Sequence, residues 1–151
     1  MIGKLTGEQI EEVLMDNVMG HIGFNDGRNN YVYPTHFVYD GNNIICHAQL
    51  GFKIQAMRQN KRVCLQVDEI RKDMNWKSVL VHGNYQELEE ERDRHNAMKL
   101  FVDRYLHLKI KEDTILPNTK EEKAQGNLPE HSKAVFYRIV IDERTGRFEK
   151  E

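Results

Sequence analysis

The sequence predicts a mainly β (α+β) protein, an antiparallel sheet or barrel of about six strands with short helices packed outside it. Segments rich in β-branched and aromatic residues outnumber those with helical apolar spacing. The helical segments do not alternate regularly with the strands, as they would in a parallel α/β sheet. Gly83, inside the longest strand segment, indicates a bulge or sharp bend of the kind that lets a sheet curl into a barrel.

Local signals predict three helices. Thr6 and Gln9 have the spacing of a capping box, and apolar residues that follow them share one helical face. A second helix follows Gly51, with Ile54 and Met57 as its apolar residues. A third apolar face lies in the charged segment after residue 89. The predicted helices span residues 6–15, 52–59 and 90–106.

The six predicted strands span residues 21–24, 31–39, 44–48, 62–69, 76–88 and 134–142. Asp40-Gly41-Asn42-Asn43 is a strong hairpin signal between the second and third strands. Pro34 cannot donate to a strand ladder, so its strand is expected at an edge, at a bulge or at a strand end. Residues 109–133 are polar and contain proline and glycine, which predicts a long surface excursion. A charged tail is predicted after residue 142.

Composition narrows the class of protein. A chain of 151 residues with 39% hydrophobic and 30% charged residues suits one folded domain over residues 1–151. A net charge of -2 argues against a nucleic-acid or anionic-membrane partner. The chain shows neither a signal peptide nor an apolar run near the ~20 residues of a membrane span. Cys46 and Cys64 lie in apolar segments without CxxC spacing, so we expect buried free thiols in a reducing cytoplasm.

The segment around Gly51 carries the strongest local signal for ligand binding. A strand stops at Gly51 and the chain resumes as a helix, whose first N–H groups lack partners within the helix. Lys53 adds a positive charge in the first turn, and His47 lies just before the turn. This pattern predicts an anion site, with phosphate as the usual occupant. Taken alone, it is equally compatible with ordinary turn chemistry.

Other chemical patterns have weaker support. Four histidines fall on predicted strands, but there is no HxH or HExxH motif and no acidic or thiol cluster at ligand spacing. No metal site is therefore expected. No serine stands in a GxSxG turn. Cys46 and His47 are adjacent in a strand, so they point to opposite faces and are not expected to form a catalytic pair.

Three motifs occur in an order and spacing that resemble a known family. They are Pro34-Thr35-His36-Phe37-Val38-Tyr39-Asp40-Gly41, Ile44-Ile45-Cys46-His47-Ala48-x-x-Gly51-x-Lys53 and Trp76-Lys77-Ser78-Val79-Leu80-Val81-His82-Gly83. The sequence resembles the FMN-binding split-barrel flavoproteins, and most of all the nitroimidazole-resistance (Nim-type) branch of the pyridoxamine 5'-phosphate oxidase-like superfamily. The resemblance runs nearly from end to end, although relatives often carry tryptophan where Arg144 stands.

The resemblance implies a six-stranded antiparallel split β-barrel with flanking helices, assembled as a homodimer with FMN in clefts between the subunits. It implies that Gly51 and Lys53 bind the FMN phosphate, and that the strand around His36 offers main-chain groups to the flavin ring. The implied FMN-binding residues are Pro34, Thr35, His36, Phe37, His47, Ala48, Gly51, Phe52, Lys53, Trp76 and Ser78. Phe37 and Trp76 are equally compatible with a role as core aromatics.

The implied function is an FMN-dependent oxidoreductase that passes electrons from NADH or NADPH to a small flat acceptor, such as a nitroaromatic (5-nitroimidazole). His47 is the catalytic candidate, because an imidazole can donate a proton or hold an anion near neutral pH. It is equally compatible with a role in FMN binding alone. Two alternatives remain: a non-catalytic flavin-binding protein, and a haem-binding or haem-utilisation split barrel with His36, His47 or His82 as axial ligand.

Overall fold

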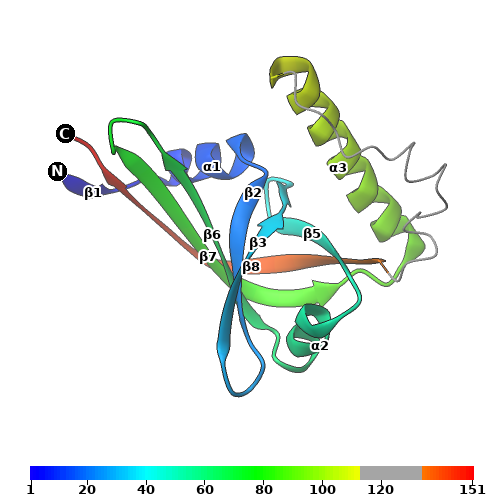
Figure 1. The fold of residues 1–151 in the computed structure, drawn as a ribbon. Helices are drawn as coiled ribbons and strands as arrows, with labels where there is room; N and C mark the ends of the chain where they lie inside the picture. Colours follow the sequence, from blue (N-terminus) through cyan, green and yellow to red (C-terminus); the bar gives the residue numbers. More distant parts are fainter. Residues whose placement is uncertain (113–133) are drawn as a thin grey trace.

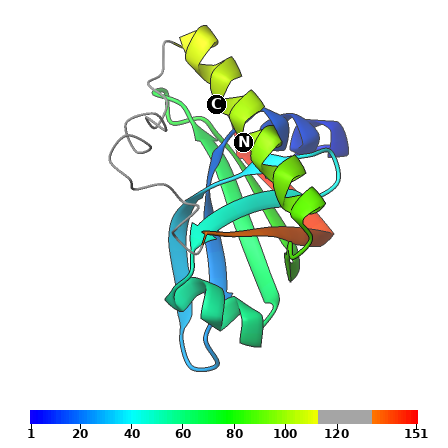
Figure 2. The same ribbon diagram turned by 90° about the vertical axis from the view of Figure 1, so that its right-hand side faces the viewer.

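The computed structural model describes residues 1–112 and 134–151, in which one curled antiparallel sheet is flanked by three helices (Figures 1 and 2). The elements are β1 (Ile2–Lys4), α1 (Gly7–Asp16), β2 (Met19–Asn25), β3 (Asn30–His36), β4 (Val38–Tyr39), β5 (Ile44–Gln49), α2 (Phe52–Gln59), β6 (Arg62–Ile70), β7 (Trp76–Glu87), α3 (Glu91–Glu112) and β8 (Ala134–Glu149). The strand order is β3-β2-β6-β7-β8-β5-β4, and β1 pairs with β8. The predicted split β-barrel is confirmed. The sheet has eight strands where six were predicted, because the short β1 gives no clear sequence signal and the predicted strand 31–39 is divided into β3 and β4.

Helix α1 begins as its capping box predicts. The Thr6 backbone N–H donates to Gln9 Oε1 at 2.8 Å, and the Gln9 backbone N–H donates to Thr6 Oγ1 at 3.2 Å. Ile10, Val13 and Leu14 are buried from this helix. The reciprocal cap satisfies amide groups that would otherwise lack partners at the start of the helix.

The predicted strand 31–39 is divided into β3 and β4 at Phe37. The Phe37 backbone N–H turns away from the ladder and donates to the Val18 carbonyl at 2.9 Å, while its side chain is fully buried. Pro34 lies in β3, which pairs with β2 and stands at one end of the strand order. The predicted edge position of Pro34 is therefore confirmed.

Strand β8 corrects the prediction of a charged tail after residue 142. It continues to Glu149 and pairs there with both β7 and β1. Its charged residues misled the interpretation because many of them alternate onto the solvent face, whereas Gly146 is buried and Phe148 packs against the core.

Helix α3 also extends beyond its predicted end, through Glu112. The predicted polar excursion is therefore wrong for residues 109–112, and the rest of it lies outside the described residues. Gly83 gives the predicted irregularity, because the β7–β8 register shifts between His82 and Gly83. A Cβ atom on Gly83 would lie only 2.2 Å from the Val140 carbonyl oxygen, so a side chain cannot be accommodated without a backbone shift.

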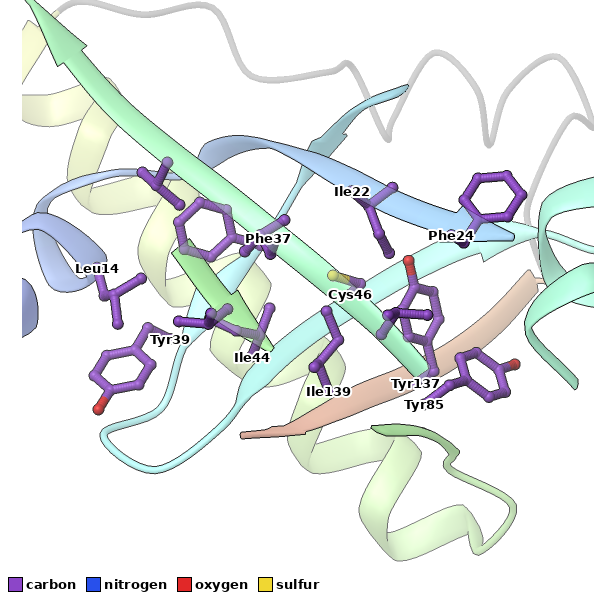
Figure 3. Close-up of a cluster of buried hydrophobic side chains, with 14 of the residues drawn as sticks. Leu14, Ile22, Phe24, Phe37, Tyr39, Ile44, Cys46, Tyr85, Tyr137 and Ile139 are labelled. Carbon is purple, nitrogen blue, oxygen red and sulfur yellow. The ribbon is translucent and has the colours of Figure 1, made fainter. Parts of the chain in front are cut away.

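Two hydrophobic clusters occupy opposite faces of the β4–β5–β8 part of the sheet. The larger one fills the barrel interior and includes Cys46 and Tyr137, which are cross-strand partners on β5 and β8 (Figure 3). Burial raises the pKa of the Cys46 thiol to about 12, as suits the predicted buried free thiol. The smaller cluster lies between the sheet and α3 and consists of Val38, Ile45, Leu88, Ala97, Phe101 and Phe136, with Tyr105 packed against it.

Candidate functional site

Strand pairing does not close the barrel between β3 and β5, which come close together, and we call this break in the pairing the opening of the split barrel. The two strands are near in space, but β3 pairs with β2, and β5 pairs with β8 and with the two residues of β4. The second half of β5 therefore continues past β4, from Cys46 to Gln49, before the chain turns at Gly51 into α2. This geometry brings the predicted residues of β3, the end of β5 and the start of α2 to one side of the molecule (Figure 1).

The start of α2 differs from the start of α1. Gly51 is its N-cap residue, no side chain caps the helix, and its first turn holds no acidic residue. Gly51 has an extended backbone with φ −175°, and an added Cβ would come no closer than 4.0 Å to another residue. The backbone conformation does not require glycine here. Glycine has no side-chain oxygen, so the first amides of α2 lack the hydrogen-bond acceptor that a serine, threonine or aspartate cap supplies.

Lys53 lies in this first turn and is half-buried. Burial lowers the pKa of its ammonium group, which means that the charged form loses hydration in the folded protein. Helices usually carry acidic rather than basic residues at this end, because a positive charge opposes the helix dipole. The lysine and the uncapped amides together favour binding of an anionic group. Such a group would accept hydrogen bonds from the amides and neutralise the lysine charge.

His47 and His36 are exposed residues, and the ring of each contacts one aromatic ring of α3. The centroid of the His47 ring is 4.8 Å from that of Phe101, with the rings nearly perpendicular, and 5.6 Å from that of Phe136. The His36 ring meets Tyr105 in the same edge-on manner at 5.6 Å. Aromatic residues of α3 therefore contact both histidines that the sequence places near the binding site.

Burial lowers the pKa of His47, and the nearby charges of His36 and Lys53 lower it further. Burial also lowers the pKa of His36. Both effects favour the neutral imidazole, which donates one hydrogen bond and accepts another. His47 and buried Cys46 point to opposite faces of β5, as predicted, so the thiol is not the partner of this histidine.

The other residues predicted on β3 and β5 divide into accessible and inaccessible groups. Pro34 is exposed and Ala48 half-buried near the opening. Thr35 is buried, and its hydroxyl donates to the His36 carbonyl at 3.2 Å. Phe37 is a core residue, so its side chain is not accessible to a ligand. Phe52 is accessible, with 49% of its surface exposed.

Trp76 and Ser78 are not near this opening in the same chain. Their strand, β7, starts at the end of the sheet opposite α2 (Figure 1). The Trp76 indole N–H donates to Glu149 Oε2 at 2.8 Å, and Ser78 Oγ accepts a hydrogen bond from Gln66 Nε2 at 2.9 Å. The structure thus brings together the predicted residues of β3, β5 and α2, and separates those of β7 from them.

Sequence reasoning did not assign Phe101 and Tyr105 to the site. The sequence predicts an apolar face of this helix formed by Ala97, Leu100, Phe101, Val102 and Tyr105. Ala97, Phe101 and Tyr105 do pack against the sheet, but Leu100 and Val102 are exposed, so that prediction is confirmed only in part. The contact between this face and the two histidines depends on how α3 crosses the sheet. The local sequence does not determine that crossing. In the described residues, no helix is long and apolar enough to cross a membrane.

Comparison with known proteins identifies the family and the fold. The family model described as pyridoxamine 5'-phosphate oxidase matches residues 6–148. An uncharacterized protein of Rhizobium meliloti is 32% identical over 124 residues, which cover 78% of this chain and 75% of the relative.

Two solved structures extend the comparison. An FAD-binding protein from Mesorhizobium loti has a TM-score of 0.76 and 26% identity, over 99% of both chains. A Bacteroides thetaiotaomicron protein, described as a candidate 5-nitroimidazole antibiotic resistance protein, has a TM-score of 0.75 and 18% identity, over 98% of this chain and 87% of the other. The class of protein is therefore a flavin-binding type of split barrel, in which β3 and β5 lie close together without pairing. Within that class, the chain belongs to the pyridoxamine 5'-phosphate oxidase family.

Proposed function

We propose that this protein binds a flavin through its FMN moiety and uses it as an oxidoreductase. Electrons pass from NADH or NADPH to a small flat acceptor such as a nitroaromatic. The observation that carries the proposal is the uncapped first turn of α2 with half-buried Lys53 beside it. FMN is the smallest flavin that carries the phosphate this site favours. The FAD-binding relative from Mesorhizobium loti and the nitroimidazole-resistance relative from Bacteroides support the cofactor and the acceptor class.

The residues of the opening fit the two ends of an FMN moiety. The first amides of α2 and the Lys53 ammonium suit the phosphate. The edge of β3 away from β2 offers backbone N–H and C=O groups for the polar edge of a flat ring. A bound flavin supplies the electron-transfer chemistry, while the protein supplies binding, orientation and the electrostatic environment.

We assign His47 a catalytic role as hydrogen-bond donor to the acceptor, because its lowered pKa disfavours the charged ring that a proton donor would need. Its lowered pKa favours the neutral ring at pH 7, so its N–H group can donate a hydrogen bond to an oxygen of the acceptor. His47 also lies between the start of α2 and the aromatic residues of α3, on the same face of β5 as Ile45. A flat acceptor would reach it from the open side of the barrel.

We further propose that the protein is a cytoplasmic homodimer. On the outer face of β3 and β2, α3 contacts His36 through Tyr105, while Val32 and Met19 on the same face are exposed apolar residues. A second copy packed on this face would bring its own Trp76 and Ser78 toward the opening of the first chain. Trp76 would then contact the cofactor from the partner side.

The test begins with the absorption spectrum of the purified full-length chain and a titration of the flavin-free protein with FMN. We expect a flavin spectrum and one FMN per chain, with light scattering giving the mass of a dimer. Lys53→Ala removes a charge-assisted contact worth about 1.5–3 kcal/mol, so FMN should bind roughly 10- to 150-fold more weakly. Lys61→Ala, an exposed lysine beyond the end of α2, is the matched control and should bind FMN normally.

Other outcomes separate the alternatives. Unchanged FMN affinity in Lys53→Ala would mean that the phosphate binds elsewhere. A Soret band after haem addition, with no flavin uptake, would favour the haem-binding function. Tight FMN binding without oxidation of NADH or NADPH in the presence of a nitroaromatic would leave a non-catalytic flavin-binding protein.

A further inference from the structure

A cluster of four aromatic rings lies beside the start of α2. Phe24 and Tyr31 are stacked with their centroids 5.3 Å apart, and Phe52 meets the edge of Tyr31 at 5.1 Å. Tyr33 lies 6.1 Å from Tyr31 and 5.6 Å from Phe24. We call these four residues the hairpin aromatic cluster, because three of them belong to the β2–β3 hairpin next to α2 (Figure 2).

The rings of this cluster are unequally covered. Phe24 is only 3% exposed and belongs to the barrel core. Tyr33 and Phe52 are 41% and 49% exposed. The Tyr31 hydroxyl donates to Asp26 Oδ2 at 3.1 Å, which holds its ring at the base of the hairpin loop. The core thus anchors one ring of the cluster, while two others present aromatic surface to solvent.

The position of the cluster relates it to the proposed phosphate site. Phe52 directly follows Gly51 and is the first residue of α2, so its ring stands next to the uncapped amides. His36 and His47 lie on the other side, beneath α3. A group joined to the far side of a phosphate at Gly51 would therefore emerge beside Phe52 and Tyr33.

We propose that the hairpin aromatic cluster binds the adenine ring of FAD, so that the flavin this protein retains is FAD rather than FMN. The inference rests on the proposed flavin function, and it adds a second subsite. In FMN the phosphate is the end of the molecule and leaves the cluster uncovered. In FAD the same phosphate is linked to an adenylate, whose flat ring suits stacking against exposed aromatic side chains.

The test compares FAD and FMN binding to the flavin-free full-length protein, by quenching of flavin fluorescence. Stacking of one base on aromatic residues predicts roughly 10- to 100-fold tighter binding of FAD than of FMN. Tyr33→Ala should remove much of this preference and leave FMN affinity unchanged. Phe52→Ala, at the first residue of α2, should weaken FAD binding more than FMN binding. Ile2→Ala is the control for loss of an exposed apolar side chain, because Ile2 is 63% exposed on β1, which pairs with the end of β8.

FMN affinity also shows whether each variant is folded. Tyr33→Leu keeps apolar volume but has no flat ring, so it should lose the preference for FAD as Tyr33→Ala does. Equal affinity of the wild-type protein for FMN and FAD would overturn the proposal. So would an unchanged FAD preference in Tyr33→Ala together with a change from dimer to monomer, because the cluster would then be a subunit contact. If Lys53 variants and wild type bind neither flavin, the proposed function itself fails, and the adenine subsite fails with it.

Discussion

Removing the Phe101 ring tests whether α3 creates the environment of His47. Phe101 is 5% exposed and belongs to the smaller cluster between α3 and the sheet. Truncation of a buried phenylalanine to alanine costs about 3–5 kcal/mol, and we expect about 3 kcal/mol because a cluster on the outside of the sheet can partly close. In a domain of this size, that loss corresponds to a fall in Tm of roughly 6–12 °C.

The second effect of Phe101→Ala concerns the pKa of His47. Burial is the largest cause of its lowered value, and the Phe101 ring lies 4.8 Å from the imidazole. Uncovering that ring should therefore raise the pKa of His47 toward the ordinary value of 6.5. Thermal unfolding by circular dichroism gives the stability, and an NMR titration assigned with His47→Gln gives the pKa.

Leu100→Ala is the control for the loss of an apolar side chain from α3. Leu100 neighbours Phe101 but is 37% exposed, so its truncation should lower Tm by a few degrees at most and leave the pKa of His47 unchanged. A Phe101→Ala protein with the wild-type Tm and an unshifted His47 would show that α3 does not cover this histidine in solution. In that case the burial described above would have to come from another element.

Two further predictions concern the barrel and its pH dependence. Gly83→Ala should lower the free energy of unfolding by about 1–3 kcal/mol, seen as a lower urea midpoint, because its Cβ would clash with the Val140 carbonyl. Gly7→Ala, where an added Cβ would have no atom within 4 Å, should leave the midpoint unchanged. Since the folded pKa values of His36 and His47 lie below the ordinary 6.5, the unfolded chain binds more protons as the solution becomes acidic. Stability present above pH 6.5 should therefore be lost as the pH falls, and replacing both histidines by glutamine should flatten that loss in denaturant titrations.

Much of the barrel follows from local sequence signals. The capping box of Thr6 and Gln9, the hairpin at Asp40 and the bulge at Gly83 each determine the backbone through a few neighbouring atoms. Such features are encoded within a short stretch of chain, so they can be predicted without knowing the partner strands. The end of β8 was missed because its charges alternate with inward-facing Gly146 and Phe148, and that alternation acquires its meaning only against β7 and β1.

The candidate site is predictable in a similar, partial way. The start of α2 could be predicted because the free amides of the helix end and the lysine of the first turn lie within three residues of one another. The cover of aromatic side chains over His47 could not, because it depends on the angle at which α3 crosses the sheet. The same holds for the hairpin aromatic cluster, whose rings come from β2, β3 and α2 and meet only in the folded barrel.

The separation of Trp76 from the β3–β5 opening gives a structural reason to expect a shared site. Strand β8 pairs with His47 through Phe136 and with Trp76 through Glu149, which puts roughly 40 Å of extended strand between the two pairings. Curling of the sheet shortens that path, yet Figure 1 shows the start of β7 and the helix α2 at opposite ends of the molecule. If Trp76 binds cofactor at all, the cofactor therefore belongs to another copy of the chain. A monomer with normal flavin affinity would instead leave Trp76 as a structural residue held by Glu149, and the dimeric part of the proposal would fail while the site at Gly51 stood.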